Sequence, residues 1–206
     1  MLQIKTIEPG TFTVLEKLMA IPELANFILV GGTALALYYG HRLSVDIDLF
    51  STDNFENETI ISIVENKCTG FTYRKNSMGI FGYVDNVKVD FVKHHHHPLI
   101  STPLKYENLT IMGLEDIIAM KINAILKRAV KKDFWDIAEL LKHYSIENFI
   151  DFYELKYPSQ QLLITIPQAI TFFDDAEESP VPVSLKGQTW ESVKKSIQKK
   201  VSQYLK

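Results

Sequence analysis

The stretch that decides the fold is Leu29–Phe50, LVGGTALALYYGHRLSVDIDLF, which places a Gly-Gly pair and two closely spaced aspartates inside an otherwise apolar run. The residues before the glycines, Asn26–Val30, form a short β-rich run. The residues after them, TALALYYG, predict a helix that begins at Thr33 and ends at Gly40. The stretch therefore predicts a strand, a tight turn and a helix in direct succession.

The two aspartates lie in the next predicted strand, Val45–Phe50, where polar and apolar residues alternate. Because successive side chains of a strand point to opposite faces, Asp46 and Asp48 are expected on one face, with Val45 and the other apolar residues on the opposite face. Two such close carboxylates raise each other's pKa unless a cation lies between them, and Mg²⁺ held by oxygen ligands is the usual cation. A lone D-x-D more often simply faces solvent.

A third carboxylate is available from a predicted hairpin. Its turn is Asp85-Asn86, and its second strand, Val87–Val92, contains Asp90. A neighbouring strand can bring this residue beside the aspartate pair. The expected ligands for Mg²⁺ or Mn²⁺ are therefore Asp46, Asp48 and Asp90.

The Gly-Gly turn gives the D-x-D more weight. Backbone N–H groups at Gly31 and Gly32 can approach an anion closely, and the helix that starts at Thr33 adds favourable partial charge; a tight turn that needs positive φ is the alternative. Ser44 is expected to hydrogen-bond phosphate, and Arg42 either does so or forms a surface ion pair. Together with the aspartates, these residues suggest a metal-bound nucleoside triphosphate.

The remainder of the chain changes from strand-like to helical periodicity. We expect an α+β fold, with a small mixed sheet and helices in a core at residues 1–110 and a mostly helical region at residues 111–206. An acidic, proline-containing stretch, Asp174–Pro182, is expected to be a loop before a final helix over Trp190–Leu205.

Lys121 lies among apolar residues at helical spacing, so its stem is expected to be partly buried and its ammonium group directed to a particular place; extension into solvent is the alternative. Asp136 follows 15 positions later (136 − 121), and on one continuous helix the two would stand ~22 Å apart. If both belong to one site, the helix must break within KRAVKK, residues 127–132. Asp133 would then be the N-cap of the next helix and Asp136 would lie in its first turn.

The glycine turn followed by the acidic strand resembles the first motif of the nucleotidyltransferase superfamily with the DNA polymerase β type of core. Within it, the GHR-x-S-x-D-I-D-L-F ending resembles the AbiEii/AbiGii toxin family. LEDIIAMKINAILKRAVKKDFWDIAELL looks like that family's other signature, in which A-M-K on a helix precedes K-D-x-x-D-I. The resemblance covers roughly residues 26 to 142.

The resemblance implies that Lys121 and Asp136 join Asp46 and Asp48 as catalytic residues. Lys121 would neutralise the nucleotide phosphates or the leaving pyrophosphate, and Asp136 would orient that lysine or help to activate the acceptor. The implied reaction moves a nucleoside monophosphate from an NTP to a hydroxyl, such as that of a tRNA end. The implied biological role is the toxin of a bacterial toxin-antitoxin or abortive-infection pair, with a cognate antitoxin.

Two alternatives stay open: transfer to a protein side chain or to an aminoglycoside-like small molecule, and a non-catalytic binding module on the same fold. The formal charge of −3 argues against a protein that coats nucleic acid by charge alone. One cysteine, a start unlike a signal peptide and the lack of a run of about 20 apolar residues predict a cytoplasmic protein with no membrane association. His94–His97 is expected to be a solvated strand end, and KRAVKK either a holder of RNA phosphates or a solvated turn.

Overall fold

A mixed sheet of seven strands and a set of helices make up the part of the chain described by the computed structural model, residues 2–206. In sheet order the strands are β3 (Thr72–Asn76), β4 (Gly79–Val84), β5 (Val87–Lys93), β2 (Ile47–Ser51), β1 (Phe27–Val30), β7 (Leu109–Ile111) and β6 (Leu104–Tyr106). The helices are α1 (Pro9–Met19), α2 (Gly31–Tyr39), α3 (Asn57–Lys67), α4 (Leu114–Arg128), α5 (Lys131–Leu140), α6 (Ile146–Lys156), α7 (Ile166–Thr171) and α8 (Trp190–Tyr204). Three short 3-10 turns complete them: η1 (Ile4–Thr6), η2 (Pro22–Leu24) and η3 (Asp174–Ala176).

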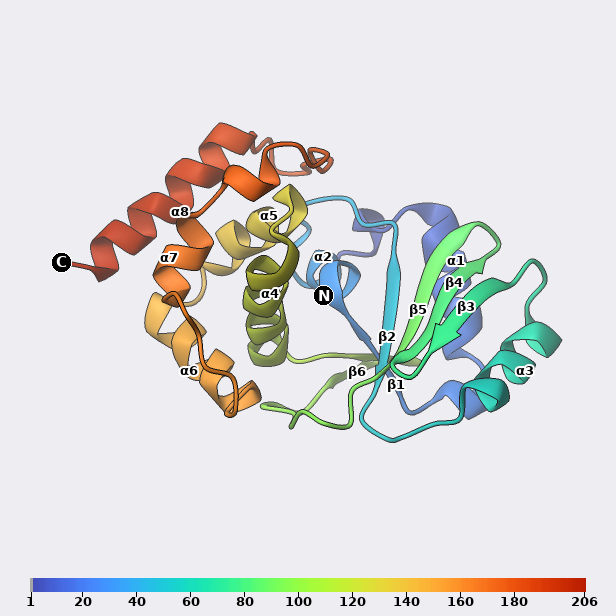
Figure 1. The fold of residues 1–206 in the computed structure, drawn as a ribbon. Coiled ribbons are helices and arrows are strands. Elements are labelled where there is room, and N and C mark those ends of the chain that lie inside the picture. Colours follow the sequence, from blue (N-terminus) through green and yellow to red (C-terminus); the bar gives the residue numbers. More distant parts are fainter. Residues whose placement is uncertain (1) are drawn as a thin grey trace.

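The expected α+β class and mixed sheet are confirmed, but the sheet is larger than the small one expected. Figure 1 shows α4 to α8 gathered on one side and the strands with α1 and α3 on the other, with α2 between them. Strand β3 was not predicted because all five of its residues are exposed, so its sequence has no alternation of apolar and polar residues.

The middle of the sheet brings the acidic residues onto neighbouring strands. Strand β1, buried along its whole length, pairs antiparallel with β2, and β2 pairs in parallel with β5. This register sets Asp48 opposite Asp90 on one side and Val30 on the other. The D-x-D strand begins only at Ile47, so Val45 lies before the strand and is 51% exposed, instead of sharing a strand face with Ile47 and Leu49 as expected.

Two turns have the predicted positions. The β4–β5 hairpin turns at Asp85 and Asn86, whose φ values of 50° and 65° are those of a two-residue turn that matches the strand twist. Helix α2 ends where Gly40 takes a left-handed φ of 62°, as predicted, but it begins at Gly31, two residues earlier than expected.

The predicted helix break within residues 127–132 is confirmed. Helix α4 ends at Arg128, the chain reverses at Ala129 with φ 39°, and α5 begins at Lys131. The predicted N-cap is wrong: Val130 occupies that position, and Asp133 lies buried within the helix. Asp136 therefore lies in the second turn of α5 instead of the first.

The C-terminal helices pack on α4 and α5 through a few large side chains. Helix α8 buries Trp190, Val193, Ile197 and Val201, and the Trp190 ring stacks on that of Trp135 with centroids 5.9 Å apart. A buried salt bridge joins α6 to α4: Lys156 Nζ lies 2.7 Å from Asp116 Oδ1, and both side chains are fully buried. Across residues 2–206, none of the helices combines the length and the apolar character that crossing a membrane would require.

Candidate functional site

The glycine turn lies directly against the side chains that follow it in sequence. A Cβ atom added at Gly31, where φ is +70°, would stand 2.5 Å from Asp48 Oδ2. One added at Gly32 would stand 2.2 Å from Nη2 of Arg42. Gly31 needs glycine for its left-handed backbone as well as for space, whereas a side chain at Gly32 would displace the guanidinium of Arg42. The N-terminus of α2, which has no side-chain cap, therefore opens beside Asp48.

Two hydroxyl groups join the turn to the aspartates. Thr33 Oγ1 lies 2.9 Å from Ser44 Oγ, and Thr33 Oγ1 also donates to the backbone carbonyl of Asp46. Both side chains are buried. They fix the segment that carries the D-x-D against the first turn of α2.

The three predicted metal ligands lie together, but lysines hold two of them. Burial raises the pKa of Asp48; Lys88 opposes this change, and Asp90 and Asp46 add to it. Lys88 Nζ donates to Asp90 Oδ2 at 2.5 Å, and Lys132 Nζ donates to Asp46 Oδ2 at 3.0 Å. The other oxygen of Asp90, Oδ1, is buried and has no hydrogen-bond partner among residues 2–206.

This donor set fits a hard divalent cation in kind. Carboxylate oxygens are the ligands that Mg²⁺ and Mn²⁺ prefer, and an orphaned buried oxygen beside a carboxyl group with a raised pKa marks a place where positive charge is wanted. In the described part of the chain, however, no group of three or more His, Cys, Asp or Glu is already arranged to hold a metal. The site of Asp46, Asp48 and Asp90 stays a prediction.

Lys121 is buried and directed, as expected, and does not extend into solvent. Its Nζ lies 2.6 Å from Asp136 Oδ2 and 3.0 Å from Asp133 Oδ1, and only 4% of the residue is exposed. Burial alone would lower the lysine pKa, but Asp136 and Asp133 outweigh it and raise the pKa. The ammonium group is thus held charged and fixed in place.

Asp136 also binds two residues of the first motif. Arg42 donates to it twice, from Nε at 2.7 Å and from Nη2 at 2.9 Å, and His41 Nε2 lies 2.7 Å from Oδ1. Burial favours the neutral acid, yet Arg42, Lys121 and His41 hold the pKa of Asp136 well below its usual value. The surface ion pair considered for Arg42 is wrong, since the residue is 4% exposed and its partner is fully buried.

One small cavity, of about 50 Å³, gathers most of the predicted residues. Its lining consists of Gly31, Gly32, Thr33, Arg42, Ser44, Asp46, Asp48, Lys121, Arg128 and Lys132. We call it the acid–glycine cavity. Asp136 lies behind it, bound to Lys121 and Arg42, and Asp90 lies beside it on β5. The tertiary structure thus unites the glycine turn, the D-x-D and the returning helical lysine.

Four contributors were not assigned to the site from the sequence: Lys88, Arg128, Lys132 and Asp133. The signal for Lys88 was its place two residues before Asp90 on one strand, which puts both on the same face. Arg128 and Lys132 belong to KRAVKK, which is not a simple solvated turn: Lys131 is buried and donates to the carbonyls of Glu177 and Ser179. Asp133 binds Lys121 and Arg128 instead of capping α5.

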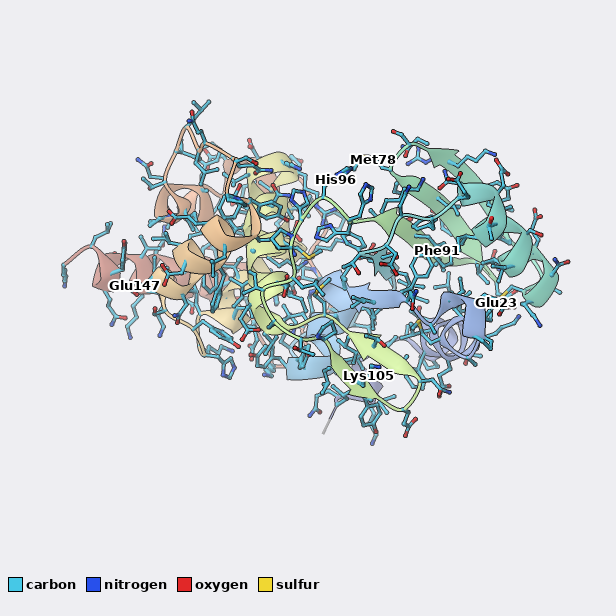
Figure 2. The ribbon with its side chains drawn as sticks, turned by 90° about the horizontal axis from the view of Figure 1, so that it is seen from below. Glu23, Met78, Phe91, His96, Lys105 and Glu147 are labelled. Atoms are coloured by element: carbon cyan, nitrogen blue, oxygen red, sulfur yellow. The ribbon has the colours of Figure 1, made fainter. Side chains whose placement is uncertain are left out.

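The histidine run is not a solvated strand end throughout. His94 is 7% exposed, and its ring packs against Phe50 at a centroid distance of 5.1 Å. His94, His96 and His97 line a cavity of about 390 Å³ that shares Gly31, Asp48, Lys121 and Arg128 with the acid–glycine cavity. Figure 2 shows His96 where the helical side meets the strands. The run therefore borders the candidate site.

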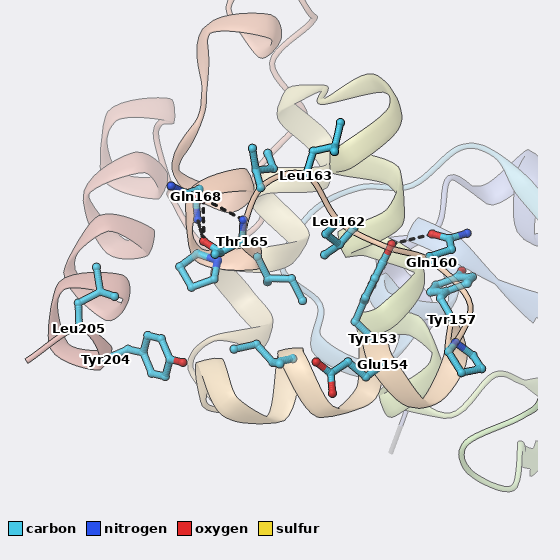
Figure 3. A pocket seen from close by; sticks show the side chains of 15 residues that line it. Tyr153, Glu154, Tyr157, Gln160, Leu162, Leu163, Thr165, Gln168, Tyr204 and Leu205 are labelled. Atoms are coloured by element: carbon cyan, nitrogen blue, oxygen red, sulfur yellow. Dashed lines mark hydrogen bonds between the residues drawn. The ribbon is translucent and has the colours of Figure 1, made fainter.

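A larger hollow, of about 800 Å³, lies elsewhere. Figure 3 shows its walls, which come from α6, the following loop, α7 and the end of α8, with Tyr153 Oη 2.7 Å from Gln160 Oε1. It contains none of the residues predicted for chemistry, and its only acidic side chain is Glu154. Size alone does not mark the chemical centre of this molecule.

Comparisons with known proteins identify the family and the fold of the chain. A family model described as nucleotidyl transferase AbiEii toxin, Type IV TA system, matches residues 13–198. An uncharacterized protein of Aquifex aeolicus (strain VF5) is 32% identical over 198 residues, which are 93% of this chain and 94% of that protein. Two solved structures share the fold. MenT4, a nucleotidyltransferase toxin from Mycobacterium tuberculosis H37Rv, has a TM-score of 0.60 at 13% identity and covers 94% of this chain and 82% of its own. A nucleotidyltransferase described as putative, from Helicobacter pylori, has a TM-score of 0.52 at 15% identity and covers 96% and 98%.

Proposed function

The chain belongs to the AbiEii family of nucleotidyltransferase toxins, and from this premise we propose that it transfers a nucleoside monophosphate from an NTP to an acceptor hydroxyl with the help of Mg²⁺ or Mn²⁺. It is a nucleotidyltransferase with the polymerase β-like fold. The observation that carries the proposal is the acid–glycine cavity, where an open helix N-terminus, two aspartates and a fixed ammonium group meet.

The roles proposed for the residues follow from their charges. The N–H groups of Gly31, Gly32 and Thr33 bind the outer phosphates at the N-terminus of α2, with the Ser44 hydroxyl beside them. Asp46 and Asp48 would hold the divalent ion, which would supply positive charge at the α-phosphate and lower the pKa of the attacking hydroxyl. Asp90 is the third ligand or the base that accepts the hydroxyl proton.

The positive residues act on the leaving group. As the acceptor oxygen bonds to the α-phosphorus, the bond to the β-phosphate oxygen breaks and pyrophosphate leaves with the added charge. Lys121, fixed by Asp133 and Asp136, stabilises that charge without having to move. Arg42 contributes by holding Asp136, and its charge lies against Gly32 at the phosphate turn.

The open face of the outer strands supports RNA as the acceptor. In the strand register, Arg74, Phe81 and Asp90 lie in one row, and Tyr83 and Lys88 lie opposite each other in the next. These side chains border a hollow of about 460 Å³ on the face that carries the carboxylates. Aromatic rings and cations on an open sheet suit stacked bases and phosphates. We therefore propose a single-stranded RNA end, such as that of tRNA, as the acceptor.

The family's toxin-antitoxin description also supports a cognate antitoxin as partner, and a site of action in the bacterial cytoplasm, where NTPs and tRNA are found. The sequence predicts a core at residues 1–110 and a helical region at residues 111–206. Lys121 and Asp136 both belong to the helical region. On this proposal, nucleotide binding bridges the two parts.

Purified protein with Mg²⁺ and each labelled NTP is expected to transfer label to total tRNA and to release pyrophosphate. Label should stay with the RNA after denaturation and be lost on nuclease digestion. A parallel reaction with cell protein and one with a small aminoglycoside test the other acceptor classes. Label found only in one of these refutes the RNA acceptor, and no transfer to any acceptor contradicts the enzymatic proposal.

Tyr83→Ala is expected to raise the KM for the RNA acceptor about 10-fold, since stacking of one base on an aromatic side chain contributes about 1–3 kcal/mol. The KM for NTP should be unchanged because Tyr83 lies on the outer strands, away from the acid–glycine cavity. Tyr204→Ala changes another exposed tyrosine, at the end of α8 and outside this hollow, and is the matched control. An unaltered acceptor KM in Tyr83→Ala would rule out stacking at this face.

A further inference from the structure

The cavity that the histidine run borders continues from the proposed phosphate site. It has a volume of about 390 Å³, within the range of roughly 300–1,000 Å³ typical of small-molecule sites. Its lining includes Gly31 and Asp48 as well as His94, His96 and His97. The remainder of a nucleotide whose phosphate lies at Asp48 can therefore extend into this cavity.

The walls of the cavity suit a flat, partly polar group. Phe50 and Tyr157 contribute rings, and Met120 and Asn123 face the cavity from α4. His97 packs edge-on against Tyr157 with ring centroids 4.8 Å apart. The lining also contains four cations, which suit phosphates: Lys93, Lys121, Lys127 and Arg128. The rings and apolar side chains suit the heterocycle of the same nucleotide.

One polar atom of His94, a residue that lines this cavity, lacks a partner. Nε2 of His94 is buried and has no hydrogen bond to any of residues 2–206, and the residue is 93% buried (100 − 7). The backbone N–H of His94 donates to the Ser51 carbonyl at 2.8 Å, so the position of the residue is fixed at the end of β5. A buried polar atom without a partner is costly, which indicates that a ligand atom completes it.

The charge state of His94 narrows the kind of ligand. Burial, with help from the charges of Lys156 and His97, lowers its pKa to about 4. The imidazole is therefore neutral at physiological pH, with one nitrogen that donates and one that accepts. A neutral imidazole has no charge with which to hold phosphate, but its two nitrogens match the donors and acceptors on the edge of a nucleobase.

We propose that this cavity, the histidine pocket, binds a nucleobase and that the imidazole of His94 forms a hydrogen bond with the edge of that base and so selects among bases. The proposal rests on the nucleotidyl transfer proposed above. The base belongs either to the NTP or to the terminal nucleotide of the acceptor, since both meet at Asp48.

His94→Phe tests the pocket because it keeps a flat ring and removes both ring nitrogens. The control is His95→Phe, the adjacent exposed histidine, which does not line the cavity. For each protein, kcat and KM are measured with all four NTPs on one acceptor, and then with one NTP on acceptors that differ in the terminal base. Thermal unfolding checks that both variants are folded.

His94→Phe is expected to reduce the ratio of kcat/KM between the best and the worst base about 10-fold, mainly through KM, and His95→Phe to leave it unchanged. If His94→Phe changes the selectivity among the four NTPs, the pocket binds the base of the NTP. If it changes the selectivity among the acceptors, the pocket binds the terminal base of the acceptor. If His94→Phe still transfers label and keeps the wild-type selectivity for both NTP and acceptor, the proposed role of the histidine pocket is wrong, and the proposed nucleotidyl transfer is unaffected. A wild-type protein that transfers no label overturns the proposed function and the pocket with it.

Discussion

Asp48→Asn is expected to lower the rate of nucleotidyl transfer at least about 1,000-fold, while the folded protein becomes no less stable. The carboxylate is the proposed ligand of the divalent ion, and an ion in such a place contributes several kcal/mol of transition-state stabilisation, with about 1.4 kcal/mol for each factor of ten. The neutral amide keeps the shape of the side chain and removes the charge. Transfer of label is measured with saturating NTP and acceptor.

The stability of the same variant separates a functional role from a structural one. Burial, with Asp90 and Asp46, raises the pKa of Asp48, so its ionised form weakens the ligand-free fold. That penalty grows as the pH rises from the unfolded pKa through the folded pKa. Removing the charge should therefore leave the melting temperature unchanged or higher, as is common for residues strained for function.

Addition of Mg²⁺ with NTP should raise the melting temperature of the wild type and not that of Asp48→Asn. Asp175→Asn, an exposed aspartate in η3, is the charge-matched control and should behave as the wild type in every assay. An Asp48→Asn protein that keeps a tenth or more of the wild-type rate would remove Asp48 from the catalytic centre.

Asp136→Ala is expected to lower the free energy of unfolding by about 3–5 kcal/mol, because removal of one partner leaves buried charge uncompensated. Asp136 is fully buried and accepts from both Nε and Nη2 of Arg42, and it lies 2.6 Å from Lys121 Nζ. Asp133 still compensates Lys121 in the variant, but Arg42 loses its partner. Urea unfolding at neutral pH measures the change.

Asp151→Ala is the matched control, an exposed aspartate within α6, and should change the free energy of unfolding by less than about 0.5 kcal/mol. A loss in Asp136→Ala as small as that of the control would show that the buried network adds little to stability. Asp136→Asn, which keeps an acceptor oxygen for Arg42, should fall between the two.

The same network predicts how stability depends on pH. The pKa of Asp136 is depressed in the folded protein, so its contribution is fully present above the unfolded value of about 3.9 and is lost as the pH falls through the folded value. Asp133 adds in the same direction, since Lys121 and Arg128 overcome its burial and lower its pKa. In urea titrations between pH 6 and pH 3, Asp136→Ala should lose less stability than the wild type.

The sequence by itself determined the features that depend on neighbours along the chain. The glycines before α2, the left-handed end at Gly40 and the two-residue hairpin at Asp85-Asn86 each follow from backbone preferences that a few residues specify. The break between α4 and α5 was predicted by distance, since one helix would have carried Lys121 and Asp136 apart.

Only the tertiary structure decided which charged groups are buried together. Arg42 and Asp136 stand 94 residues apart in the chain. Their bidentate pair exists because the segment that follows α2, which carries Arg42, lies against α5. Asp133 fitted the pattern of an N-cap, yet its carboxylate binds Lys121 and Arg128, since a buried ammonium group needs a counter-charge more than a helix end needs a cap. His94 looked like one of four equivalent histidines, and the structure buries it with its ring against Phe50 and His97. Local preferences fix the course of the backbone, whereas the partner of a charge depends on segments distant in the sequence, which no single stretch of it can specify.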